Sequence, residues 1–203
     1  MQNTDITVEK ISHIFVKFGE GDEKAFSFFY KYFINDLYAY GRSLGVDERY
    51  VMDAVQDVFL KVFFDKPPLT SVEHFKYFLF KSLKNRLYDL FKSKSFSKTD
   101  DINDDVLNFS IKTTVLDEII EEEDRIIIQQ KIESLLSVLS PLQKEALYLR
   151  YIQELEYAEI SEIMDKTEVS IRKLVSQAIH TIRKENKLLS MIVFMGLLCD
   201  KFW

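Results

Sequence analysis

Apolar residues recur at helical spacing through the N-terminal half of the chain, where they predict four helices separated by clear breaks. The spacing of three or four positions holds over residues 1–18, 23–44, 48–64 and 72–91. Residues 19–22 and Gly45 interrupt the pattern, and the pair Pro67-Pro68 cannot continue a helix. Asp47 and Ser71 stand where N-caps are expected. We therefore expect one compact lobe of four helices.

Residues 140–185 predict three short helices, of which the last two form a helix-turn-helix. The middle helix covers about residues 156–165 and ends at the polar turn Lys166-Thr167-Glu168. Thr167 is the expected N-cap of the third helix. That helix carries one apolar stripe at i, i+4, i+7 and i+11, formed by Ile171, Val175, Ala178 and Ile182. The stripe is expected to pack on the two preceding helices.

The opposite face of this third helix is polar and basic. It consists of Arg172, Lys173, Ser176, Gln177, His180, Arg183 and Lys184. Such donors suit phosphate oxygens and base edges in the major groove, which a helix of this kind enters with its N-terminus first. The same pattern also fits an ordinary three-helix lobe with a solvated basic face, so DNA binding needs a second indication.

The charges of the chain are segregated, although the net charge of −6 by itself argues against a nucleic-acid partner. Residues 76–98 hold six Lys and one Arg against one Asp, a local charge of +6, and residues 172–187 hold five Lys or Arg against one Glu, a charge of +4. Between these blocks, residues 100–124 hold ten acids against one Lys, a charge of −9. No apolar period is sustained over residues 93–115, which predicts a linker.

Composition supports the same architecture, because 17 Phe and 10 Tyr occur beside only 5 Gly and 3 Pro. This favours helices over a turn-rich β fold. The predicted fold is all-α: two helical lobes joined by an acidic linker, with a helix-turn-helix as the C-terminal lobe.

The fourth predicted helix interleaves aromatic rings with cations. Rings stack on unpaired bases while ammonium groups hold the backbone, so this pattern suits single-stranded nucleic acid. The alternative is that most of the rings are core, and we expect a buried stripe of Phe75, Phe78, Leu79 and Leu83. The side chains off that stripe are the candidates for contact: Tyr77, Lys81, Lys84, Asn85 and Tyr88.

The sequence offers no catalytic constellation, metal site or cofactor motif. His13, His74 and His180 are far apart, no Gly-rich phosphate loop occurs, and Cys199 is the only cysteine, which excludes a disulfide within the chain. We expect no enzyme activity. The polar start MQNTDITVEK is unlike a signal peptide, and the apolar residues 188–199 are too few for a membrane span.

Two separate motifs resemble the extracytoplasmic-function (ECF) group of sigma-70 family RNA polymerase sigma factors. GDEKAFSFFYKYF (residues 21–33), DAVQDVFLKVF (53–63) and HFKYFLFKSLKNRLYDLFK (74–92) are similar in order and spacing to the promoter-melting domain of that family. LSPLQKEALYLRYIQELEYAEISEIM in the C-terminal half resembles its helix-turn-helix domain. The resemblance implies four parts: sigma region 2 at residues 9–94, an acidic linker at 95–124, sigma region 4 at 125–187 and an apolar tail at 188–203.

The resemblance also implies a function for each surface. Asp53, Gln56 and Asp57 correspond to the face that docks on polymerase core. The loop at residues 65–74 and Lys81, Lys84, Asn85 and Tyr88 correspond to the part that captures the melted minus-ten element. The last helix corresponds to the reader of the minus-thirty-five element, where we expect contacts from Arg172, Lys173, Ser176, Gln177 and His180. The sequence departs from the family pattern at Val169 and Leu174, so these two are left out.

The implied protein is a bacterial, cytoplasmic and nucleoid-associated sigma factor whose partners are RNA polymerase core and promoter DNA. An anti-sigma factor is a further candidate partner, and the apolar tail is either a cap on the C-terminal lobe or a docking site for a regulator. The main alternative is a LuxR-like helix-turn-helix regulator without a sigma role, which leaves residues 76–98 and the Asp53 face unexplained. A helical adaptor is the other alternative, and it predicts no salt-dependent DNA affinity.

Overall fold

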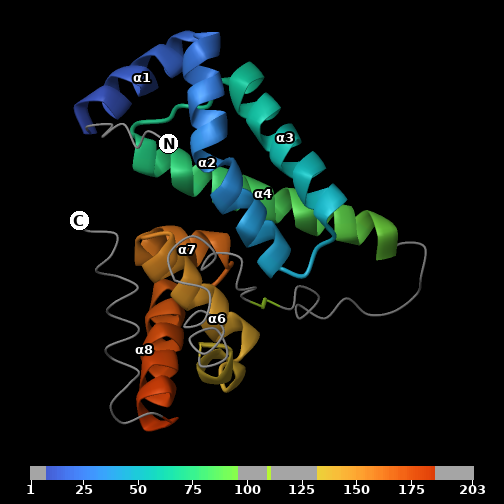
Figure 1. The fold of residues 1–203 in the computed structure, drawn as a ribbon, viewed down its shortest axis with the longest axis vertical. Coiled ribbons are helices and arrows are strands. Elements are labelled where there is room, and N and C mark those ends of the chain that lie inside the picture. The colour runs from blue at the N-terminus through green and yellow to red at the C-terminus, as the bar shows by residue number, and fades with distance from the viewer. Residues whose placement is uncertain (1–7, 96–108, 111–131, 186–203) are drawn as a thin grey trace, which may run out of the picture. The chain divides into compact units, whose positions relative to one another are not determined.

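The computed structural model describes residues 8–95, 109–110 and 132–185, and every element in these ranges is helical (Figure 1). The first half forms α1 (Val8–Glu20), α2 (Glu23–Ser43), α3 (Glu48–Asp65) and α4 (Val72–Ser95). The second half forms α6 (Pro141–Leu147), the π-helical turn η2 (Tyr148–Ile152), α7 (Tyr157–Ile163) and α8 (Glu168–Glu185). The predicted all-α fold is confirmed. The described residues divide into two compact units, residues 8–42 with 46–95 and residues 43–45 with 109–110 and 132–185.

Local signals set the ends of the helices, as the sequence indicates. Asp47 caps α3 by accepting a hydrogen bond from the Arg49 backbone N–H at 3.1 Å, and this bond is the main reason why the pKa of Asp47 lies below its usual range. At the other end Lys66 adopts a left-handed conformation with φ 44°, and its N–H donates to the Val62 carbonyl. Ser71 accepts from the His74 N–H at the start of α4.

The core of the N-terminal unit is built from phenylalanine rings around Phe75 of α4. Phe75 is fully buried, and its ring lies near five others, at centroid distances of 4.8 Å to Phe18, 5.6 Å to both Phe29 and Phe33, 6.1 Å to Phe15 and 6.4 Å to Phe59. These rings come from α1, α2 and α3, so one residue of α4 joins all four helices.

A glycine permits close approach of α2 and α3. A Cβ atom added at Gly41 would lie 2.6 Å from a Cγ atom of Val51, which is fully buried. The contact sets how near the two helices lie, because any larger side chain at Gly41 must push Val51 aside.

The C-terminal unit packs α6 and α7 against α8. Ser140 begins α6 with a capping box, in which its Oγ accepts from the Gln143 N–H and the Gln143 side chain accepts from the Ser140 N–H. Thr167 Oγ1 accepts from the Ser170 N–H at 3.2 Å, which confirms it as the cap of α8. The predicted stripe is confirmed as core, since Ile171, Val175, Ala178 and Ile182 are all buried.

Two predictions about α4 are wrong in detail. The helix continues to Ser95 rather than ending at Phe91. Phe78 is half-buried, and Phe80 is fully buried in its place, with its ring 5.2 Å from that of Tyr40. The buried arc of α4 is wider than one stripe because it meets both α2 and α3.

Several predictions fall outside the described residues. They concern the start of the first helix (1–7), most of the acidic linker and the apolar tail 188–203. Within the predicted linker, Phe109 is described and buried, and its ring lies 5.6 Å from that of Tyr148. The linker prediction did not anticipate this contact with the C-terminal unit.

Candidate functional site

The three residues predicted to bind polymerase lie on the exposed face of α3. Asp53, Gln56 and Asp57 are all exposed, while Val55, Val58 and Phe59 turn into the core. Leu60 and Phe64 continue the same face, because positions 53, 57, 60 and 64 follow at i, i+4, i+7 and i+11. Leu60 is 49% exposed and Phe64 74% exposed. The sequence analysis missed these two apolar residues, although their spacing from Asp53 could have identified them.

Asp57 is also joined to α4. The Arg86 guanidinium donates to Asp57 Oδ2 from Nε at 3.0 Å and from Nη2 at 2.8 Å, and both side chains are about half exposed. This pair links α3 to α4 and engages one oxygen of the carboxylate. Asp53 and Gln56 therefore stand as the more accessible polar groups of the face.

The outward side of α4 carries the residues predicted to contact single-stranded DNA. Asn85 is exposed, and Lys81, Lys84 and Tyr88 are half-exposed. Positions 81, 84, 85 and 88 are related by steps of three or four residues, so they lie along one face of α4. This face is turned away from Phe75.

Rings and cations on this surface are paired with one another. Lys81 Nζ donates to the Tyr77 hydroxyl at 2.9 Å, and the His74 ring stacks on the Tyr77 ring at a centroid distance of 5.9 Å. Farther along, Lys92 Nζ lies 4.5 Å from the centre of the Tyr88 ring. The surface thus offers flat aromatic faces beside held ammonium groups, which is the chemistry that stacking on unpaired bases requires.

The loop before α4 is anchored to the helix. Thr70 contacts the His74 ring through its N–H and its hydroxyl, at 3.3 Å and 3.0 Å from Nδ1. The pKa of Glu73 is lowered, first by a hydrogen bond from its own backbone N–H and then by one from the Ser71 hydroxyl. These bonds join the end of the predicted capture loop, residues 65–74, to the first turn of α4.

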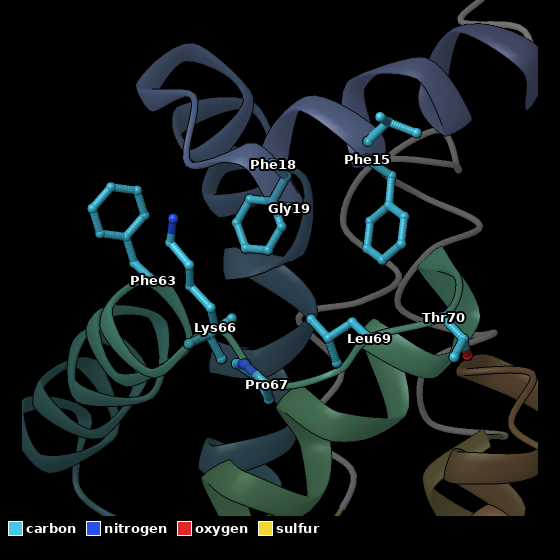
Figure 2. A pocket seen from close by; sticks show the side chains of 10 residues that line it. Phe15, Phe18, Gly19, Phe63, Lys66, Pro67, Leu69 and Thr70 are labelled. Atoms are coloured by element: carbon cyan, nitrogen blue, oxygen red, sulfur yellow. The ribbon is translucent and has the colours of Figure 1, made fainter.

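A pocket of about 320 Å³ opens beside this loop (Figure 2). Figure 2 shows the rings of Phe15 and Phe18, from α1, directed toward Leu69 of the loop. Lys66 and Phe63 lie at the α3 side of the pocket. The lining combines aromatic and aliphatic side chains with Lys66 and Thr70, so the pocket presents both apolar and polar surface.

The outward face of α8 carries all five residues predicted to read duplex DNA. Arg172, Lys173, Ser176, Gln177 and His180 are exposed. Val169, in the first turn, is 77% exposed and has the largest exposure among the big apolar side chains that the structure describes. Leu174 is half-buried.

Arg172 differs from its neighbours because it already has partners. Its Nε and Nη2 donate to Glu168 Oε1, and its guanidinium lies 4.2 Å from the centre of the Tyr157 ring. Arg150 lies 4.9 Å from the centre of the same ring. By contrast, Lys173, Ser176 and His180 make no side-chain hydrogen bond to any described residue. Arg172 therefore links α8 to α7, and DNA contact would compete with that role.

The described residues contain no cluster of His, Cys, Asp or Glu that could hold a metal ion. Within the same residues, no helix is long and apolar enough to cross a membrane.

Comparisons with known proteins agree on one family. A family model described as Sigma-70, region 4, matches residues 129–181, which include α6, α7 and most of α8. The ECF RNA polymerase sigma factor SigM of Bacillus subtilis (strain 168) is 26% identical over 151 residues, covering 73% of this chain and 87% of SigM. An alignment of 151 residues is longer than the C-terminal half of the 203-residue chain, so it includes part of the N-terminal half.

A solved structure has the same fold. It is titled "Structure of CnrH in complex with the cytosolic domain of CnrY", and it matches 85% of this chain and 94% of its own with a TM-score of 0.51. The two sequences are 17% identical, so this likeness concerns the fold.

Proposed function

Since the chain belongs to the ECF group of the sigma-70 family, we propose that it binds RNA polymerase core, directs it to specific promoters and helps to melt them. The observation that carries this proposal is the outward side of α4, where Tyr77, Lys81, Tyr88 and Lys92 form ring and cation pairs. A regulator that binds only duplex DNA through α8 would not need rings and cations on α4 that suit unpaired bases.

Promoter melting is assigned to the outward side of α4 together with the pocket beside the loop. Stacking on Tyr88 and the neighbouring rings would hold unpaired bases, and Lys81 and Lys84 would hold the backbone between them. The pocket beside the loop holds the rings of Phe15 and Phe18 together with the polar groups of Lys66 and Thr70, so an unstacked base could meet both apolar and polar partners there. Duplex recognition is assigned to the outward face of α8, which would lie in the major groove of the minus-thirty-five element.

Polymerase binding is assigned to the exposed face of α3. Polar groups at Asp53 and Gln56 would set the orientation of docking, and the aromatic ring of Phe64 would supply much of the affinity. The exposure of Leu60 and Phe64 supports this assignment. A partner that covers the two side chains would remove their apolar surface from water, which favours binding.

Two more features of the proposal concern partners and location. CnrH was solved in complex with the cytosolic domain of CnrY, and by analogy we expect an anti-sigma protein to regulate this chain. The proposed partners place the protein in the bacterial cytoplasm at the nucleoid, and its part in transcription is that of a specificity factor rather than an enzyme.

The proposed docking face is tested by charge reversal. Asp53→Lys combined with Gln56→Ala should weaken binding to purified core polymerase by more than about tenfold. The variant puts a positive charge in place of a carboxylate and removes an amide at the proposed interface. Fluorescence anisotropy with labelled protein measures the affinity, and circular dichroism checks that helicity is unchanged.

The matched control is Asp36→Lys with Asn35→Ala, which makes the same kinds of substitution, with the same change in net charge, on α2 of the same unit. It should bind core like the wild type. Equal affinity of the α3 variant and this control would remove the proposed role of the α3 face.

A further inference from the structure

The first residue on the outward face of α8 is apolar. Val169, Lys173, Ser176 and His180 follow at i, i+4, i+7 and i+11, on the side of the helix opposite to the buried stripe of Ile171 and its partners. Val169 is therefore central on this face, in the first turn of α8.

Folding of the free chain does not explain a valine at this position. At 77% exposure Val169 gains little from burial, and a β-branched residue lowers helix propensity slightly. A single exposed valine is ordinary on a protein surface. What distinguishes Val169 is its place among groups that suit DNA, with Lys173 one turn later and Lys166 in the turn before the helix.

The polar residues beside Val169 are already engaged. Ser170 is hydrogen-bonded to Thr167 through both its N–H and its hydroxyl, and Arg172 is held by Glu168 and the Tyr157 ring. The outer side of the first turn of α8 therefore carries the apolar side chain of Val169, while the nearby Arg172 guanidinium is bound to other groups of the protein.

Base edges in the major groove carry one prominent apolar group, the C5 methyl of thymine. A helix that enters the groove N-terminus first brings its first turn nearest to the base edges. Apolar side chains at such positions contact this methyl, while the surrounding cations are attracted to the phosphates.

We propose that Val169 is a specificity-determining residue that contacts the C5 methyl group of one thymine in the upstream promoter element. The inference rests on the proposed function, because it assumes that α8 reads duplex DNA. It adds a residue that the family pattern did not suggest and a chemical group that it recognises.

The test uses holoenzyme, assembled from core polymerase and the full chain, and a duplex library with a randomised upstream element. Enriched sequences are resynthesised with each thymine in turn replaced by deoxyuridine, which lacks only the C5 methyl. At one position, loss of the methyl should weaken wild-type binding roughly three- to fivefold, as expected for one buried methyl group.

The variant Val169→Ser should bind the thymine and deoxyuridine duplexes equally at that position. The matched control is Val138→Ser, which alters another exposed valine of the same unit outside α8 and should keep the wild-type preference. Melting temperatures equal to that of the wild type would show that neither change disturbs the fold.

Two results would overturn the proposal, and only the second would also overturn the proposed function. If sequences are enriched but Val169→Ser keeps the preference for thymine, or no thymine methyl matters, the role of Val169 is wrong and the proposed function stands. If holoenzyme enriches no sequence at all, the proposed function fails and the role of Val169 fails with it.

Discussion

At the scale of single residues, the candidate surfaces depend on which side chains are held and which are available. Asp57 and Arg172 were both predicted to contact partners, but Arg86 holds the first and Glu168 with Tyr157 holds the second. Exposed ion pairs of this type contribute roughly 0–1 kcal/mol to stability, so a partner can displace them at small cost.

The first residue-scale prediction concerns promoter melting. Lys81→Ala should reduce the permanganate reactivity of promoter thymines several-fold, because it removes a cation beside Tyr77 that would hold the melted strand. Binding of the variant to core polymerase should be unchanged, since Lys81 is not on α3.

Its control is Lys24→Ala, which removes an exposed lysine at the start of α2. This variant should melt promoters normally. Normal melting by Lys81→Ala as well would contradict the role given to the outward side of α4.

At the scale of helices, local rules predicted most of the fold, and distant contacts account for what they missed. The Thr167 cap and the Ile171 stripe involve neighbours within one or two turns, so spacing alone identified them. The burial of Phe80 depends on Tyr40 of another helix, and the Arg86–Asp57 pair joins residues 29 positions apart. The pocket beside the loop likewise needs α1 and the end of α3 together.

An element-scale prediction follows from the contact of α2 with α3. Gly41→Ala should destabilise the protein by about 1–3 kcal/mol despite the better helix propensity of alanine, because the new methyl meets Val51 at 2.6 Å. Urea unfolding followed by circular dichroism measures the change in free energy of unfolding.

The double variant Gly41→Ala with Val51→Ala should cost less than the sum of the two single changes, since each relieves the other, with a coupling of roughly 0.5–3 kcal/mol. Strict additivity, or a Gly41→Ala protein as stable as the wild type, would show that the two helices do not press together there.

At the scale of the whole molecule, the sequence alone indicated the resemblance to ECF sigma factors and the two basic blocks with an acidic block between them, and the structure showed which side chains of each surface are exposed. We expect the net charge of −6 to oppose indiscriminate binding to DNA and the basic residues of α4 and α8 to attract it locally. Helical spacing from Asp53 could have placed Leu60 and Phe64 on the outer face of α3, but the degree to which they and Val169 are exposed depends on how whole helices pack.

The central claim is that this chain gives polymerase core a promoter specificity. Run-off transcription by bacterial core polymerase on genomic DNA of the source organism, with and without the protein, tests it most directly when the new RNA 5′ ends are sequenced. The account predicts discrete start sites that appear only with the protein, share an upstream element and disappear with the Asp53→Lys, Gln56→Ala variant. An unchanged set of starts, together with binding of the protein to duplex DNA, would contradict it and favour a helix-turn-helix regulator of the LuxR-like type.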